Sequence, residues 1–201
     1  MDIEKLIRAV QQALGVDVDG KAGPQTWAAI ASKVIPDKAR ALTSTTSSGV
    51  DERSKKNIDT LLPEVRPYAI ALVQKAALNG IQVKIISGLR TYAEQDELYA
   101  KGRPDNGPKV TNAKGGQSNH NFGIAFDVGI FEGSEYLSRS SKYKAVGVLG
   151  MDLGLDWGGN WKSFKDEPHF QLRPDWANGM AEKEMLAELR YRKAEGMDVF
   201  V

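Results

Sequence analysis

The two histidines of this 201-residue sequence, His120 and His169, each lie in a segment that mixes polar and apolar residues. Between them, Asp127 lies in the middle of residues 123–131, a run that is otherwise apolar and has the length of a β-strand. A buried carboxylate costs several kcal/mol unless a cation or several hydrogen-bond donors compensate it. Asp127 therefore needs a partner, and the sequence indicates a site built around this acid.

Strand alternation places Asp127 on one face with Ala125 and Gly129, whose small size leaves room for a metal ion. Two neutral imidazoles and one carboxylate, with the fourth position left to water, are the ligands of a catalytic zinc site. Such a metal polarises a carbonyl and lowers the pKa of its water to about 7, so hydrolysis at neutral pH becomes feasible. Alternatively, Asp127 is a salt-bridged core acid and the histidines are incidental surface residues, and spacing alone leaves both interpretations open.

Two short helices precede the elements that must position these residues. Apolar residues recur at helical spacing over 3–14 and again over 27–34, after a loop with two glycines and a proline. A helix–loop–helix of this size is too small to bury much core alone. Small polar residues fill 43–49, as is typical of a flexible linker. The predicted organisation is a helical module at 1–36, a linker at 37–56 and a larger domain at 57–201.

The larger domain alternates between helical and extended patterns without a regular βαβ rhythm. The sequence therefore predicts an α+β fold with a central antiparallel sheet flanked by helices. Extended segments are expected at 81–87, 123–131 and 168–172, and helices at 61–76, 91–100, 140–149 and 176–193.

The composition excludes several classes of function. Lys and Arg number 27 against 26 Asp and Glu, so no net field attracts nucleic acid or anionic lipid. The absence of cysteine excludes thiol nucleophiles, disulfides and thiolate zinc sites. No stretch approaches the roughly 18 apolar residues of a membrane span. We expect a monomeric globular protein.

Three motifs resemble the signatures of the D-alanyl-D-alanine carboxypeptidase-like zinc peptidases. Residues 118–127, Ser-Asn-His-Asn-Phe-Gly-Ile-Ala-Phe-Asp, match Ser-x-His-x-x-Gly-x-Ala-x-Asp, and Asp-Glu-Pro-His-Phe at 166–170 resembles the second signature. Ser-Gly-Leu-Arg-Thr at 87–91 resembles the upstream arginine motif, which continues to Gln95. Gly-Gly-Gln-Ser at 115–118 and Trp-Gly-Gly-Asn-Trp at 157–161 are similar to segments of bacteriophage endolysins that cut the L-alanyl-D-glutamate bond of peptidoglycan stems.

The resemblance implies a role for each of these residues. Arg90 would stabilise the developing oxyanion, although an arginine more commonly forms an ordinary surface ion pair. The zinc ligands would be His120, Asp127 and His169, and substrate would be bound by Ser118, Gln95 and Trp157.

For the general base, spacing and resemblance disagree. Strict strand alternation favours Glu167, two residues before His169, whereas the family places the base three residues before it, at Asp166. We follow the family, because Pro168 and the loop before it need not be regular strand, and keep Glu167 as the second candidate.

The N-terminal segment resembles the peptidoglycan-binding type 1 repeat through Val-Gln-Gln-Ala-Leu-Gly at 10–15 and Asp-Gly-Lys-Ala-Gly-Pro-Gln-Thr at 19–26. It is shorter than the usual three-helix unit. Trp27 continues the helical period, so we expect it to fill the core of this module rather than to stack on a sugar.

These observations predict a modular phage endolysin that uses Zn²⁺ to hydrolyse the L-alanyl-D-glutamate bond of peptidoglycan. The alternatives are a carboxypeptidase that trims stem peptides, or a non-catalytic wall-binding protein. The first residues lack a basic segment followed by an apolar run. We therefore expect the protein to remain in the host cytoplasm until a holin lesion releases it to the periplasm or cell wall.

Overall fold

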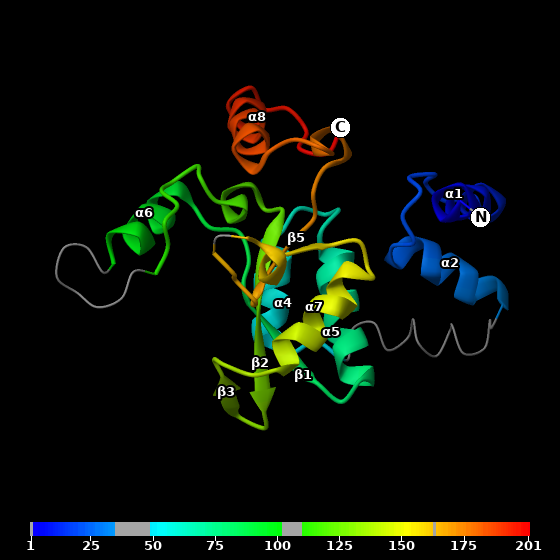
Figure 1. Cartoon of the computed structure of the whole chain (residues 1–201), viewed down its shortest axis with the longest axis horizontal. Helices are drawn as coiled ribbons and strands as arrows, with labels where there is room; N and C mark the ends of the chain where they lie inside the picture. The colour runs from blue at the N-terminus through cyan, green and yellow to red at the C-terminus, as the bar shows by residue number, and fades with distance from the viewer. Residues whose placement is uncertain (1, 35–48, 102–109, 163) are drawn as a thin grey trace.

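The computed structural model describes residues 2–34, 49–101, 110–162 and 164–201 (Figure 1). The helices in these residues are α1 (Ile3–Leu14), α2 (Pro24–Val34), α4 (Glu52–Asp59), α5 (Arg66–Leu78), α6 (Tyr92–Ala100), α7 (Lys142–Met151) and α8 (Glu182–Ala194). The strands are β1 (Gln82–Ser87), β2 (Ala125–Glu132), β3 (Glu135–Leu137), β4 (Asp156–Trp157) and β5 (His169–Gln171). Three short 3₁₀ helices complete the list: η1 (Asn119–Phe122), η2 (Gly158–Asn160) and η3 (Asp175–Ala177). None of the described helices combines the length and apolarity needed to cross a membrane.

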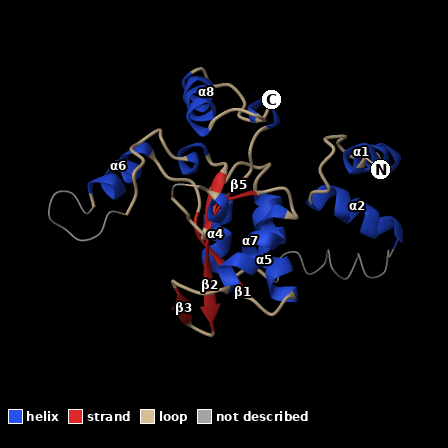
Figure 2. Ribbon diagram, viewed as in Figure 1, coloured by secondary structure: helices blue, strands red, loops and turns tan. Residues whose placement is uncertain are grey.

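The strands form one antiparallel sheet in the order β1-β2-β5-β4, with β3 paired to the far end of β2 (Figure 2). This arrangement confirms the α+β prediction. Strand β2 lies between β1 and β5, and it carries Asp127 in direct register with Ser87 on one side and His169 on the other. The sheet therefore places the isolated acid and the second histidine side by side.

The main hydrophobic core lies between the sheet and helices α4, α5 and α7 (Figure 1). Phe126, Val128 and Ile130 of β2 are fully buried in this core. Because successive strand residues face opposite sides, Asp127 points away from it, as the alternation predicted.

Helix α8 begins six residues later than predicted. The segment expected to be helical from Trp176 instead contains the short helix η3 and a turn at Gly179, whose φ of 80° is left-handed backbone that favours glycine. From Glu182 the helix is regular, and its buried residues Met185 and Leu189 pack with Phe122 and Ile124 in a second, smaller cluster. Helix α8 thus covers the loop that carries His120.

Helix α4 overlaps the segment predicted as a linker, 37–56. Helix α4 starts at Glu52, inside the expected linker, because Asp51 caps it and Ser54 is buried against β1, where its hydroxyl accepts the Ile85 N–H at 2.9 Å. Residues 35–48, which form most of the predicted linker, lie outside the described residues.

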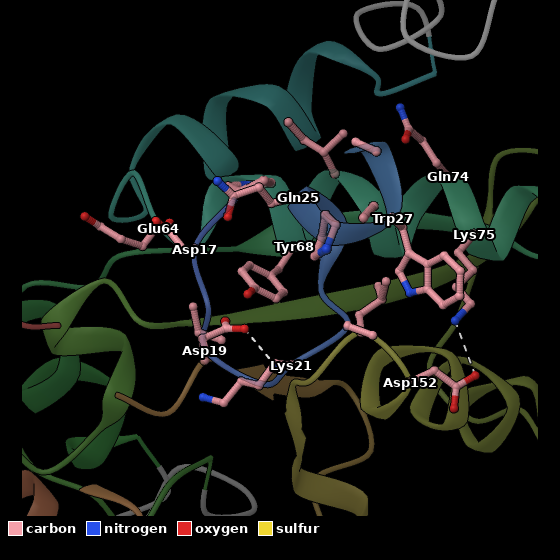
Figure 3. Close-up of a pocket in the computed structure, with 18 of the residues that line it drawn as sticks. Asp17, Asp19, Lys21, Gln25, Trp27, Glu64, Tyr68, Gln74, Lys75 and Asp152 are labelled. Carbon is pink, nitrogen blue, oxygen red and sulfur yellow. Dashed lines mark hydrogen bonds and ion pairs between the residues drawn. The ribbon is translucent and has the colours of Figure 1, made fainter. Parts of the chain in front are cut away.

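The N-terminal module is held together by a polar side chain. Gln11 is 1% exposed, donates to the Thr26 hydroxyl and the Lys21 carbonyl, and accepts from the Gly20 N–H. Trp27 is 54% exposed, so the prediction that it fills the module's core was wrong. It instead lines a crevice between α2 and α5, where Figure 3 shows it near Lys75.

Candidate metal centre and active-site cavity

Three side chains converge on the open face of the sheet. Asp127 Oδ1 lies 3.2 Å from His120 Nε2 and 3.3 Å from His169 Nδ1, and one potential ligand atom from each residue lies within 4.8 Å of the others. Asp127 and His169 meet through the β2–β5 register, whereas His120 comes from η1, a turn that ends at Gly123 with a φ of 71°. The three predicted metal ligands are therefore brought together.

Each imidazole uses its other nitrogen to contact an oxygen outside the cluster. His120 Nδ1 lies 2.8 Å from the Gly88 carbonyl, which can only accept, so this nitrogen donates and Nε2 is the nitrogen that faces the cluster. His169 Nε2 lies 3.0 Å from Gln171 Oε1, which leaves Nδ1 facing Asp127. Such outer contacts are the usual way in which a protein orients histidine ligands.

The donor set and its spacing fit a zinc ion. Ligand distances of about 2.1 Å at a tetrahedral ion place two donors about 3.4 Å apart, close to the two separations measured around Asp127 Oδ1. Burial opposes ionisation of Asp127, but the adjacent His120 and His169 outweigh it and hold the carboxyl pKa well below its usual value. Asp127 is thus an ionised carboxylate, as a metal ligand must be.

Arg90 lies beside this cluster. Its Nη2 is 3.6 Å from Asp127 Oδ2 and its side chain is only 18% exposed, so the alternative of an ordinary surface ion pair does not describe it. Its guanidinium also donates to Gln95 Oε1 at 2.8 Å and to Ser87 Oγ at 3.1 Å. These contacts fix a cation at the edge of the cavity, where it could stabilise a developing negative charge.

Gln95 does not occupy the position expected of a substrate-binding residue. It is fully buried behind Arg90, it donates to the Ala113 carbonyl at 2.8 Å, and it is not among the residues that line the cavity. In this position Gln95 contacts Arg90 on one side and the segment 111–113 on the other.

The two candidate bases lie in different positions. The Asp166 carbonyl accepts the His169 N–H at 3.1 Å, so residues 166–169 form a turn and strand alternation does not extend back to Glu167. Asp166 lines the cavity, and burial, with a further contribution from the Asp127 charge, raises its pKa. Glu167 is not among the lining residues, and its carbonyl accepts from Trp157 Nε1 at 2.7 Å.

Two tryptophans form part of the same cavity. Trp157 lines it but is only 8% exposed, and its ring packs closely against Gly147 and Gly159. Trp161 lies against the ring of His169, with centroids 4.9 Å apart. Ser118, the third predicted substrate-binding residue, lines the wall formed by the His120 loop.

Sequence reasoning missed a group of polar residues behind His169. Gln171, Asn119 and Glu182 form a hydrogen-bonded series that starts at this histidine. The alternation of β5 offered a signal for Gln171, because residues two apart on a strand share a face. Asn119 lies inside the motif at 118–127, at a position where the motif fixes no residue type, and Glu182 comes from a distant segment that no local pattern linked to the site.

Comparison with protein families matches two parts of the chain. Residues 111–172 match the model described as D-alanyl-D-alanine carboxypeptidase, and residues 2–30 match the putative peptidoglycan binding domain. The first match contains all three residues of the His120, Asp127 and His169 cluster.

The chain also resembles known peptidases, among them the following. The peptidoglycan L-alanyl-D-glutamate endopeptidase CwlK of Bacillus subtilis is 39% identical over 127 residues, which cover 57% of this chain and 75% of that protein. The L-alanyl-D-glutamate peptidase of Listeria phage A118 is 30% identical over 123 residues, which cover 60% of this chain and 41% of the phage protein. The crystal structure of the Serratia marcescens L-Ala D-Glu endopeptidase ChiX matches with a TM-score of 0.48 and 25% identity, over 61% of this chain and 87% of that chain.

Proposed function

Because this chain belongs to the D-alanyl-D-alanine carboxypeptidase family of peptidases, we propose that it hydrolyses the L-alanyl-D-glutamate bond of peptidoglycan with Zn²⁺ held by His120, Asp127 and His169. The convergence of these three donors beside Arg90 and Asp166 is the observation that carries the proposal. The Bacillus and phage relatives are named as L-alanyl-D-glutamate peptidases, which supports the choice of bond.

The residues around the cluster supply the remaining steps of a peptide hydrolysis. A zinc ion in this position would polarise the scissile carbonyl and lower the pKa of its water. The Asp166 carboxylate accepts a proton from the attacking water and returns it to the leaving amine. Arg90, fixed by Gln95 and Ser87, donates hydrogen bonds to the carbonyl oxygen as negative charge develops on it.

Analysis of the ends released from purified sacculi tests the proposed bond. Digestion with the zinc-loaded protein should create free N-terminal D-glutamate, measured by dansylation and mass spectrometry. Release of terminal D-alanine alone would instead identify a carboxypeptidase, and unchanged sacculi would identify a wall-binding protein without catalytic activity.

We also propose that the protein acts as a phage endolysin that reaches the wall through a holin lesion. The phage relative and the combination of a wall-binding module with a peptidase domain support this role. Cells that express the protein in the cytoplasm should keep their turbidity until the membrane is permeabilised. Rapid lysis without permeabilisation would contradict the proposed route.

The N-terminal module is expected to strengthen attachment to the insoluble wall, because two linked sites on one polymer raise the effective concentration of each. Exposed Trp27 provides an aromatic surface in the crevice of Figure 3. Trp27→Ala should weaken sacculus binding roughly fivefold, for a contact of about 1 kcal/mol. A pelleting assay measures this change.

The matched control for Trp27→Ala is Val18→Ala, which removes an exposed apolar side chain of the module outside the crevice. Neither variant should change hydrolysis of a short soluble stem peptide. Equal sacculus binding by both variants would show that Trp27 has no part in attachment.

A further inference from the structure

We propose that Gln171 is a positioning residue for the metal site, and that Glu182 of the C-terminal helix sets its orientation through Asn119. The inference rests on the proposed metal site and concerns how the protein presents His169 to the ion. Gln171 and Asn119 are 1% and 4% exposed, so their amide groups cannot exchange partners freely with water.

The order of donors and acceptors begins at Glu182. Its ionised carboxylate can only accept hydrogen bonds, so the Asn119 group that contacts it must be the Nδ2 amide. The same Nδ2 lies 2.5 Å from Gln171 Oε1, so the second amide hydrogen of Asn119 is donated to Gln171. Reversal of the Asn119 amide would bring oxygen against oxygen at both contacts.

This orientation has a visible cost. With both amide hydrogens of Asn119 directed at Gln171 and Glu182, its Oδ1 is the one buried side-chain polar atom among the described residues without a hydrogen-bond partner. A buried acceptor without a partner destabilises the folded protein. The protein keeps this unpaired oxygen, as expected if both Asn119 hydrogens must point toward Gln171 and Glu182.

The series ends at the metal ligand. The Asn119 amide fixes which end of the Gln171 amide points inward, because it donates to Oε1. The same Oε1 lies 3.0 Å from His169 Nε2 and accepts its hydrogen bond. His169 Nε2 therefore donates to Gln171, and Nδ1 is the ring nitrogen that faces Asp127 at 3.3 Å. Gln171 thus holds the imidazole ring so that Nδ1 faces the site proposed for the metal ion.

The outer end of the series is anchored at the surface of the cavity. Glu182 is the first residue of α8, and its second oxygen accepts from Arg173 Nη2 at 2.8 Å. Arg173 is held in turn by Asp156 Oδ2 at 3.0 Å. Helix α8 also donates from Arg190 to the Gly116 carbonyl, so the C-terminal helix supports both the His120 loop and the His169 strand.

The test compares zinc affinity, measured by competition with a chromophoric chelator, in full-length variants. Gln171→Leu removes the acceptor and should weaken zinc binding 10–100-fold. Gln171→Glu keeps an oxygen acceptor and should bind within a few-fold of wild type. Gln11→Leu is the matched control, because Gln11 is equally buried and hydrogen-bonded but lies in the N-terminal module.

Two results would overturn the inference. One is wild-type affinity in Gln171→Leu. The other is an equal loss in Gln171→Leu and Gln171→Glu, which would mean that the oxygen acceptor does not support zinc binding. If thermal unfolding shows that Gln171→Leu does not fold, Glu182→Gln carries the test. The new amide can donate as well as accept, so it no longer forces Asn119 into one orientation, and zinc binding should weaken severalfold. Unchanged affinity would refute the proposal. Failure of the wild-type protein to bind zinc would instead refute the metal site itself.

Discussion

Replacement of Asp166 by Asn should lower kcat by about 10²–10⁴-fold while zinc binding is unchanged. The amide fills the same space in the cavity but cannot accept the proton of the attacking water, and positioned general acid–base groups contribute a factor of this size. Single-turnover hydrolysis of a stem-peptide substrate, together with metal analysis of the same preparation, measures both quantities.

Glu167→Gln is the matched control for this prediction. It makes the same carboxylate-to-amide change one residue along the chain, on a side chain that does not line the cavity. It should retain turnover close to that of wild type. A loss confined to Glu167→Gln would reverse the assignment of the base.

Arg90→Met should lower kcat by about 10²–10³-fold, as expected when a charged donor to a developing oxyanion is lost. The long apolar side chain preserves most of the packing against Gln95 but removes the hydrogen bonds to Gln95 and Ser87. A partial return of kcat in Arg90→Lys would indicate that charge contributes separately from the planar guanidinium geometry.

The alternative for Arg90 is that it only neutralises Asp127, from which it lies 3.6 Å. In that case Arg90→Met would change zinc affinity more than kcat. Steady-state kinetics at saturating zinc separate the two roles, and a raised KM with unchanged kcat would contradict a role in the transition state.

Strand alternation predicted the direction of the Asp127 side chain because β2 is regular. A single acid in an apolar strand needs a cation or hydrogen-bond donors beside it. The position of Asp127 in its strand therefore indicated where a site should lie. The pairing of Asp127 with His169 across two strands could not be read from the sequence, because register depends on the whole sheet.

The same alternation failed where the chain leaves the strand. Glu167 would share a face with His169 in an extended segment, but a turn closed by the Asp166 carbonyl and the His169 N–H presents Asp166 to the cavity instead. Family resemblance captured this turn, whereas local periodicity could not.

Tertiary contacts also overrode the expectations for Trp27 and Gln95. Helical spacing indicated a core position for Trp27, yet the small module is centred on the hydrogen bonds of Gln11 and leaves the indole exposed. Gln95 belongs to a motif of the active site but is buried behind Arg90, which no local pattern distinguishes from contact with substrate.

Metal dependence of turnover tests the convergence of His120, Asp127 and His169 most directly. The protein should bind one equivalent of zinc, lose stem-peptide hydrolysis when a chelator removes the ion, and regain it when zinc is returned. Full turnover by protein shown by elemental analysis to be free of metal would contradict the account.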